Sequence, residues 1–300
     1  MMKEQVNEKI AVVVVTYNRL TLLKECISAL GSQSRKPDDI IVVNNSSTDG
    51  TFEWLMGQKY LSVITQENFG SAGGQYTGIK LAFERSYDWI WCMDDDTIPT
   101  EYALEELIKI VWAKKNEKIG FLASKVLWTD STPHKMNLPL YFHNKNIWNY
   151  IGEDKYSFGI HKIDLNSFVS CLFNRDAIQH VGYPDKRFFI WFDDVEYTSR
   201  FKCFNNYYVS SSVVYHKTKE NTVGNLLHPG KELETKMYYG LRNFFYFYRE
   251  YNKYILLKFV LKFILVNSVN LIQNKTTINV VINSFSRMLK GYRGEMDSLI

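Results

Sequence analysis

The sequence predicts an α/β fold in which a mostly parallel sheet is flanked by helices and followed by a helical C-terminal extension. Three observations support this prediction. A unit of strand, polar loop and helix recurs four times within the first 95 residues, as in parallel sheets covered on both faces. The run IAVVVV at residues 10–15 is typical of a strand buried on both faces. Residues 232–300 lack this alternation and are expected to be mostly helical.

Changes in hydrophobic periodicity delimit the elements of the first half. Strands are expected at residues 10–15, 40–43, 62–65 and 89–93, and helices at residues 20–30, from residue 51 and at residues 75–85. The polar clusters TYNR, NNSSTDG, NFGSAGG and DDD each follow one of these strands. Because ligands of such sheets bind beyond the carboxyl ends of the strands, the four clusters predict one site at one edge.

The second half is less regular. Residues 129–164 are polar and aromatic without clear periodicity, so we expect inserted loops or hairpins that cover the site. A strand is expected at residues 166–175 and a helix at residues 195–204.

Composition excludes several classes of protein. A hydrophobic fraction of 46% excludes a disordered chain, and the aromatic fraction of 15% fits either an aromatic core or a sugar- or membrane-facing surface. The four Cys form no CxxC pair and no zinc spacing, so we expect reduced thiols in a cytoplasmic protein. The start MMKEQVNEKI has no signal-peptide pattern, and no strongly apolar stretch of 18 residues is free of charge, so no clear membrane span is expected.

The segment DWIWCMDDDTIP places three carboxylates directly after an apolar strand. Adjacent carboxylates repel one another and gain nothing from packing, so a cation is expected beside them. Alternation along an extended chain turns Asp94 and Asp96 to one side and Asp95 to the other. Carboxylate oxygens select hard cations such as Mg²⁺ or Mn²⁺, and one of them can instead hold a ribose hydroxyl. The alternative interpretation is a solvated acidic turn.

Two further carboxylates, Asp193 and Asp194, follow the apolar residues of FFIWFDDVEY. Apolar surroundings raise the pKa of a carboxylate and make it a better general base. The alternative is a helix N-terminus, where the helix dipole favours acidic residues, and both interpretations can hold together.

His216 ends the apolar run of VVYHKT, where it can join carboxylates on a metal, although a lone His is more often an ordinary core or surface residue. The glycine-rich residues 68–74 match neither GxGxxG nor a P-loop, but they permit close approach of the backbone to a ligand. A metal beside backbone amides suits a diphosphate leaving group, and a second carboxylate pair suits deprotonation of an attacking hydroxyl. Together these parts predict transfer of a group from a nucleotide diphosphate to an acceptor alcohol.

A family resemblance rests on the same residues. VVVVTYNR, IIVVNNSSTDGT, NFGSAGG, WIWCMDDD, FFIWFDDVEY and VYHKT, in this order, resemble the GT-A glycosyltransferases of family 2 over residues 10–220. Within that family the chain is similar to the galactofuranosyltransferases and rhamnosyltransferases of bacterial cell-surface polysaccharide synthesis. The resemblance implies a Rossmann-like GT-A domain at residues 1–230. Its residues 10–125 would bind the nucleotide and residues 126–230 the acceptor.

The resemblance also implies roles for single residues. It implies a Mn²⁺ or Mg²⁺ site formed by Asp96, Asp94 and His216, and an inverting reaction with Asp194 as catalytic base and Asp193 beside it. The residues implied in donor binding are Thr16, Asn18, Arg19, Asn45, Asn68, Gly74, Asp94 and Asp95. Many members have Asp where this chain has Asn45, and Asn can hydrogen-bond either uracil or thymine. Asn45 thus leaves the nucleotide open. The combination of WIWCMDDD, FFIWFDDVEY and VYHKT most resembles the galactofuranosyltransferases, so UDP-galactofuranose is the favoured donor, with dTDP-rhamnose as the alternative.

The C-terminal region needs a separate explanation. Residues 231–300 contain eleven Lys/Arg and five Asp/Glu, a net charge of +6, whereas the whole chain has +4. Basic, aromatic and aliphatic residues interleave at helical spacing, as in helices that lie in a membrane interface. Because the acceptors of the resembling enzymes are lipid-linked glycans, we expect peripheral association with the inner face of the cell membrane. The alternative is a helical subdomain packed on the core or on a homo-oligomer partner; nucleic acid is not expected as a partner.

Two rival functions can be weighed against this prediction. A non-catalytic nucleotide-sugar-binding partner in a synthase complex is disfavoured by the intact Asp triplet, Asp194 and His216. A nucleotidyltransferase or diphosphate hydrolase would need a triphosphate loop rich in Lys and Arg, and the sequence has none.

Overall fold

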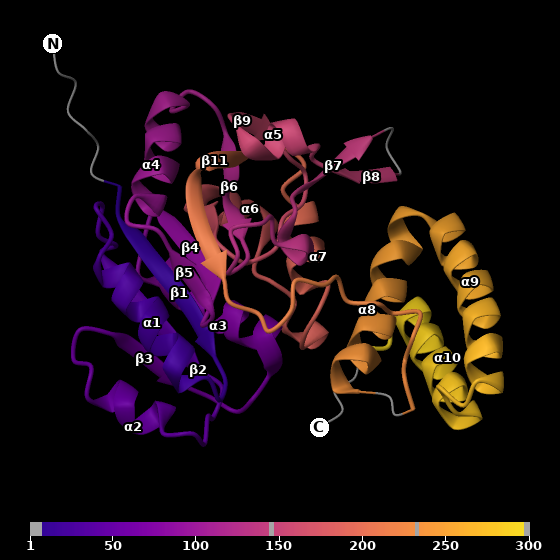
Figure 1. Cartoon of the computed structure of the whole chain (residues 1–300). Coiled ribbons are helices and arrows are strands. Elements are labelled where there is room, and N and C mark those ends of the chain that lie inside the picture. Colours follow the sequence, from indigo (N-terminus) through magenta and orange to yellow (C-terminus); the bar gives the residue numbers. More distant parts are fainter. Residues whose placement is uncertain (1–7, 144–146, 232–233, 297–300) are drawn as a thin grey trace, which may run out of the picture.

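The computed structural model describes residues 8–143, 147–231 and 234–296. A large sheet with flanking helices forms one lobe, and three C-terminal helices form a helical unit at its side (Figure 1). The first half comprises β1 (Ile10–Thr16), α1 (Leu20–Gly31), β2 (Asp39–Asn44), α2 (Thr51–Met56), β3 (Ser62–Thr65), α3 (Gly70–Glu84), β4 (Trp89–Asp94), β5 (Thr97–Pro99), α4 (Ala103–Ala113) and β6 (Ile119–Leu127). The second half comprises η1 (Lys135–Asn137), β7 (Leu140–His143), β8 (Ile147–Tyr150), α5 (Glu153–Ser157), β9 (Ile160–Lys162), β10 (Cys171–Asn174), α6 (Arg175–Val181), η2 (Lys186–Phe188), α7 (Asp193–Ser199), β11 (Asn205–His216), α8 (Thr235–Tyr251), α9 (Lys253–Ile272) and α10 (Ile278–Arg293).

The central sheet has nine strands in the order β3-β2-β1-β4-β10-β6-β11-β5, and β9 pairs with β11 outside this path. Strands β1 to β4 pair in parallel, as do β6 and β11, whereas β10 is antiparallel to both of its neighbours. The predicted α/β fold with a mostly parallel sheet is therefore confirmed. Because β10 lies between β4 and β6, the expected nucleotide and acceptor halves share one sheet.

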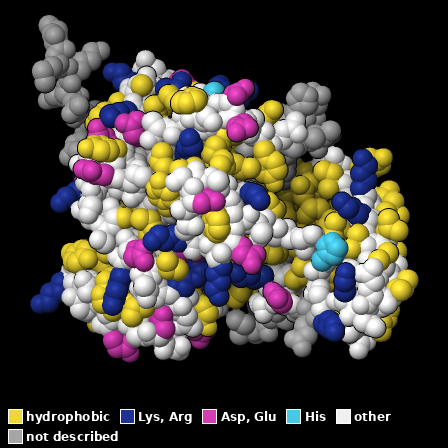
Figure 2. Space-filling view, viewed as in Figure 1, with side chains coloured by type: hydrophobic (Ala, Val, Ile, Leu, Met, Phe, Trp, Pro, Cys, Tyr) yellow, Lys and Arg dark blue, Asp and Glu magenta, His cyan; other side chains and the backbone are white. Residues whose placement is uncertain are grey.

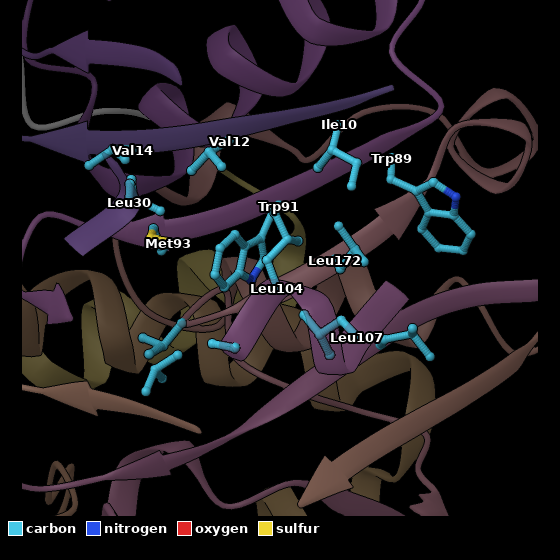
Figure 3. Close-up of a cluster of buried hydrophobic side chains, with 14 of the residues drawn as sticks. Ile10, Val12, Val14, Leu30, Trp89, Trp91, Met93, Leu104, Leu107 and Leu172 are labelled. Atoms are coloured by element: carbon cyan, nitrogen blue, oxygen red, sulfur yellow. The ribbon is translucent and has the colours of Figure 1, made fainter. Parts of the chain in front are cut away.

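Strand β1 contributes to two hydrophobic cores, one on each face of the sheet. Ile10, Val12 and Val14 pack with α1 and α4, in the cluster shown in Figure 3. Their neighbours Ala11, Val13 and Val15 face the opposite core, which includes α3. This two-sided burial explains the continuous apolar run of the strand.

Several boundaries differ from the predictions. The glycine-rich residues 68–74 are not all loop, because α3 already begins at Gly70. The strand expected at residues 166–175 is shorter, because β10 begins only at Cys171 and ends at Asn174. The helix expected at residues 195–204 is α7, which begins two residues earlier and ends at Ser199. Residues 129–164 contain the hairpin β7–β8, the short helix α5 and strand β9.

The helical unit consists of α8, α9 and α10, which enclose a small apolar core that includes Leu241, Phe263 and Met288. Helices α8 and α10 cross closely, since a Cβ atom on Gly291 would lie 1.9 Å from the Arg242 carbonyl oxygen. Within the described residues, α9 is the one helix long and apolar enough to cross a membrane, although the sequence predicted no clear span. Only 22% of an 18-residue stretch of α9 is buried, so the helix presents most of its surface outward.

Candidate active site

The three acidic residues lie where β4 ends at the carboxyl edge of the sheet. Asp94 closes β4, and the chain turns through Asp95 and Asp96 into β5. Strand β5 pairs antiparallel with the end of β11, where Thr97 lies opposite His216. This pairing brings one ligand atom each of Asp94, Asp96 and His216 within 4.8 Å of one another.

Asp95 has different partners from its two neighbours. Its carboxylate accepts a hydrogen bond from the Thr16 hydroxyl at 2.7 Å, at the end of β1. The Arg19 guanidinium, just before α1, lies 3.2 Å from Asp95 and 2.6 Å from Asp96. Arg19 therefore joins the first polar loop of the sheet to the acidic turn.

The pKa values show how strongly charge is concentrated in this cluster. Burial raises the pKa of Asp95 to about 7, although Arg19 and Thr16 act in the opposite direction. Burial and the charge of Asp96 raise the pKa of Asp94. For Asp96 the effect of burial is outweighed by the His216 hydrogen bond and by the charges of His216 and Arg19, which lower the pKa to about 2. Three carboxylates opposite one guanidinium and one imidazole leave an excess of negative charge, which favours a bound cation.

The residues present fit a divalent metal. His216 Nδ1 lies 2.8 Å from Asn137 Oδ1, and His216 Nε2 lies 3.0 Å from Asp96 Oδ1. Asn137 Oδ1 and the Asp96 carboxylate are both acceptors, so without a cation both nitrogens of the His216 ring carry a proton. Burial lowers the pKa of His216, but the hydrogen bond to Asp96 and its charge outweigh this effect and raise it. Asn137, whose amide donates to Ser167 Oγ at 2.9 Å, would keep the proton on Nδ1 and leave Nε2 to bind a metal. Two carboxylates and one imidazole suit Mn²⁺ or Mg²⁺.

A cavity of about 370 Å³ adjoins the acidic turn, within the range of small-molecule sites. Six of the predicted residues line it: Thr16, Arg19, Asn45, Asn68, Asp94 and Asp95. The amide of Asn45 is oriented by two contacts, because it donates to the Gly70 carbonyl at 3.0 Å and accepts from Gln66 at 2.9 Å. A larger cavity, of about 870 Å³, lies at the opposite end of β4, beside Trp89 and away from the carboxylates.

Two predicted donor-binding residues do not line this cavity. Asn18 joins two loops: its side-chain oxygen accepts the Thr48 N–H at 2.7 Å, and its own N–H donates to Ser47 at 2.9 Å. Gly74 lies inside α3, where a Cβ atom would be 2.3 Å from Val15 Cγ1. The structure thus gives Gly74 a role in packing α3 closely on β1.

Eight of the lining residues were not among the predicted site residues, and four of these come from the second half of the chain: Phe189, Ile190, Thr235 and Lys236. The last two begin α8, so the helical unit contributes to the wall of the cavity. Asn137 was missed as well. These residues reach the site through the tertiary arrangement of distant segments, and no local pattern marks them.

Asp193 and Asp194 form the first turn of α7. Asp193 is buried, whereas Asp194 is half-buried and accepts its neighbour's N–H, from Val195, at 2.7 Å. Burial raises the pKa of both carboxyl groups, that of Asp194 to about 6 and that of Asp193 more strongly. The charge of Asp94 adds to both shifts, which places the pair within electrostatic range of the acidic turn. The two adjacent carboxyl groups thus share surroundings that disfavour their ionised forms.

Comparison with known proteins identifies the family. Residues 11–182 match the family described as "Glycosyl transferase family 2". The chain belongs to glycosyltransferase family 2. This membership confirms the family resemblance, and together with the names of the relatives below it supports a glycosyltransferase.

Three relatives illustrate the similarity. Galactofuranosyltransferase GlfT1 of Mycolicibacterium smegmatis is 31% identical over 197 residues, 63% of this chain and 64% of the relative. The protein of the same name from Mycobacterium tuberculosis H37Rv is 27% identical over 197 residues, 63% of each chain. Poly-beta-1,6-N-acetyl-D-glucosamine synthase of Staphylococcus epidermidis is 27% identical over 183 residues, 59% of this chain and 42% of the relative. The chain thus spans less than two thirds of the length of these relatives.

Among solved structures, the chain shares its fold with a crystal structure of Staphylococcus aureus TarS, residues 1–349, in complex with UDP. The TM-score is 0.58 at 15% sequence identity, covering 97% of this chain and 83% of the TarS chain. At this identity the likeness shows the fold, and the predicted GT-A architecture is confirmed.

Proposed function

We propose that this family 2 member is a metal-dependent inverting glycosyltransferase that transfers galactofuranose from UDP-galactofuranose to a glycan acceptor. One observation carries the proposal: the cluster of Asp94, Asp96 and His216 adjoins the cavity that Arg19 and Asn45 line. The choice of sugar rests on the similarity to the M. smegmatis protein named galactofuranosyltransferase.

The donor would occupy the cavity. Arg19 is the cationic group nearest to the acidic turn, and its side chain is 44% exposed, so it can turn one edge of the guanidinium to a diphosphate. Thr16 ends β1 and Asn45 follows β2, at the carboxyl edge where nucleotides bind in sheets of this kind. Lys236 adds a second cationic side chain to the same wall.

Asp194 would be the general base. It takes the proton of the acceptor hydroxyl while that oxygen attacks the anomeric carbon from the face opposite the diphosphate. The new C–O bond forms as the bond to the diphosphate breaks, and the leaving group departs with the bonding electrons. A pKa of about 6 leaves Asp194 ionised at neutral pH. General-base assistance of this kind contributes ~10²–10⁴-fold to a rate.

The residues Asp94, Asp96 and His216 would hold a Mn²⁺ or Mg²⁺ ion. When bound, such a cation would neutralise negative charge on the departing diphosphate. Asn137 would keep His216 in the tautomer that can bind it.

We also propose that the helical unit docks on the inner face of the cell membrane, where a lipid-linked acceptor would lie. Helix α9 exposes Leu257, Leu261, Leu265 and Ile272 at 56–83% of their surface. Lys258 and Lys262 are exposed on the same helix, and Figure 2 shows basic and hydrophobic side chains together on the helical unit. Exposed aliphatic side chains with lysines between them can contact the apolar and the anionic parts of a membrane interface together.

The donor can be tested by calorimetry with UDP and with dTDP, each with and without Mn²⁺, followed by transfer assays with UDP-galactofuranose and dTDP-rhamnose. We expect metal-dependent binding of UDP and turnover of UDP-galactofuranose. Preference for dTDP and turnover of dTDP-rhamnose would instead make the protein a rhamnosyltransferase. Metal-dependent UDP binding without any turnover would indicate a non-catalytic binding partner, and binding without metal dependence would refute the metal site.

A further inference from the structure

We infer that helix α8 fixes the conformation of residues 188–192, which we call the aromatic loop, beside the active site. Through this loop, Asn243 is a positioning residue for Asp194. This inference rests on the proposed function for its kinetic test, but its structural basis is independent of the donor.

The aromatic loop has an unfavourable backbone conformation. Phe189, Trp191 and Phe192 have φ angles of 64°, 66° and 66°, although none of them is glycine. The Ile190 N–H donates to the Phe188 carbonyl at 2.8 Å, which closes a γ-turn around Phe189, whose ψ is −60°. A γ-turn with positive φ is rare and strained. Such conformations persist only where the surrounding structure holds them.

Helix α8 supplies that support through Asn243. The side-chain amide of Asn243 lies 2.9, 3.0 and 2.8 Å from the carbonyl oxygens of Phe188, Ile190 and Trp191. Asn243 is fully buried, so its amide depends on these carbonyls for the hydrogen bonds that water would otherwise provide. One side chain thus fixes three of the five carbonyls of the loop.

Arg242, the preceding residue, extends the contact. Its guanidinium donates to the carbonyls of Arg187 at 2.7 Å and of Phe188 at 3.2 Å, and its Nε donates to Asn243 Oδ1 at 3.0 Å. Arg242 is also fully buried. It therefore orients the Asn243 amide while it holds the start of the loop.

Aromatic side chains of the loop also pack directly on α8. The ring of Phe189 stacks on Tyr239 with 4.5 Å between centroids and 18° between planes. Trp191 lies over Gly240, where a Cβ atom would be 2.4 Å from the indole. Tyr239 and Asn243 are four residues apart, so they share one face of α8.

The opposite side of the loop is held by α3. The Phe189 carbonyl accepts the Ala72 N–H at 3.1 Å. At Gly70 a Cβ atom would lie 2.0 Å from the same carbonyl oxygen, so the two backbones are in close contact. The aromatic loop is thus fixed between α8 of the helical unit and the first turn of α3.

The position of the proposed base depends on this arrangement. The loop ends where α7 begins, at Asp193, and Asp194 is the next residue. Phe189 and Ile190 also line the donor cavity. Asn243 does not line that cavity; it acts through the backbone that carries Asp194.

The test uses the full chain with Asn243→Ala and Asn243→Asp, and Asn267→Ala as matched control. Asn267 is buried in the same helical unit and donates to the carbonyls of Leu227 and Phe263, both at 2.9 Å. We expect kcat for galactofuranosyl transfer to fall ~10²-fold in both Asn243 variants, the loss typical of a reacting group displaced by about 1 Å. The affinity for UDP with Mn²⁺ should be retained, because most of the groups proposed to bind it come from the first half of the chain. Amide hydrogen exchange in residues 188–194 should accelerate, and Asn267→Ala should leave both kcat and this exchange unchanged.

Wild-type kcat and unchanged exchange in the Asn243 variants would overturn the inference. An equal loss of kcat and an equal loss of Tm in Asn267→Ala would also overturn it, because the effect would then be general destabilisation. If the Asn243 variants do not fold, Tyr239→Leu decides in the same way, since it removes the ring that stacks on Phe189 and lies against the Arg242 guanidinium. If the wild-type protein transfers no sugar from either donor, the proposed function fails, whereas the exchange measurement still decides whether α8 holds the loop.

Discussion

At the scale of single residues, Asn137 determines which nitrogen of His216 is available to a metal. Its Oδ1 accepts from Nδ1, and its own amide is held by Ser167. We expect Asn137→Leu to weaken Mn²⁺ binding ~10–100-fold, as is usual when the partner of a metal-binding His is removed. Calorimetric titration with Mn²⁺ measures this, and Ser167→Ala should show a smaller loss in the same direction. Unchanged affinity in Asn137→Leu would exclude a metal at His216.

Asp194 gives a prediction for pH. Burial raises its pKa to about 6, and the base works only when ionised. The kcat profile should therefore have an acidic limb with its midpoint near pH 6, and Asp194→Asn should remove most of the activity at every pH. Retention of more than about a tenth of wild-type kcat in Asp194→Asn would contradict the assignment, given the ~10²–10⁴-fold expected of a general base.

The raised pKa of Asp194 affects stability in the opposite direction from activity, because the ionised form that is active is the less stable one. Because the folded pKa of Asp194 lies above that of the unfolded chain, its contribution favours folding at low pH and is lost as the pH rises through about 6. The Tm of Asp194→Asn minus that of wild type should therefore be higher at pH 8 than at pH 5. Thermal unfolding at the two pH values separates this effect from a simple loss of structure.

Residue-level prediction succeeded where the signal is local. The separation of Asp95 from Asp94 and Asp96 was predicted from three adjacent letters, and the structure directs Asp95 to Thr16 while the other two lie near His216. The expected extended segment is instead a turn through Asp95 and Asp96. Asn137 has no such signal, because its partner lies 79 residues away and is brought near by strand pairing. Local periodicity carries no information on contacts of this separation.

At the scale of elements, the start of α8 forms part of the donor cavity through Thr235 and Lys236. We expect Lys236→Ala to weaken UDP binding about tenfold, the loss of one charge-assisted hydrogen bond of ~1.4 kcal/mol. Calorimetry with UDP and Mn²⁺ measures the change. Lys231→Ala is the matched control, an exposed Lys that does not line the cavity. Equal affinities for both variants would remove Lys236 from the donor site.

The elements themselves were well predicted where hydrophobic periodicity was strong, as for β1, α1 and the helices of residues 232–300. The start of α3 was predicted too late, because residues 70–74, three glycines with one Ser and one Ala, were assigned to a loop. Their small size instead allows α3 to approach β1, as the contact of Gly74 with Val15 shows. A glycine selected for helix packing and one selected for a turn look the same in a single sequence.

At the scale of the whole molecule, the proposed membrane face is the outer surface of α9. We expect the full chain to float with vesicles that contain anionic lipid, and the double variant Leu261→Glu and Leu265→Glu to lose most of this binding, because charge on an interfacial face opposes insertion. Met56→Glu with Tyr60→Glu, which changes two residues of similar exposure near α2, should float like wild type. Equal flotation of all three proteins would exclude α9 as the docking face. Point variants are preferable to removal of the helical unit, since α8 holds the aromatic loop.

The order of strands was only partly predictable. The parallel neighbours β1 to β4 follow from the repeated strand–loop–helix pattern, whereas nothing in the short run of Cys171–Asn174 indicates that β10 lies between β4 and β6. A short antiparallel strand buried on both faces has no period that distinguishes it from other apolar residues.

The placement of β10 has a consequence for biosynthesis. When the first 94 residues have left the ribosome, β1 to β4 can already pair, but one edge of β4 has no partner until residues 171–174 are made. At about 5–20 residues per second, this edge of Trp89–Asp94 is open for several seconds in the nascent chain. An apolar edge strand in that state is a template for wrong pairing with another chain. Chaperones are therefore expected to bind the nascent chain mainly in this interval, before β11 is made and brings His216 to the acidic turn.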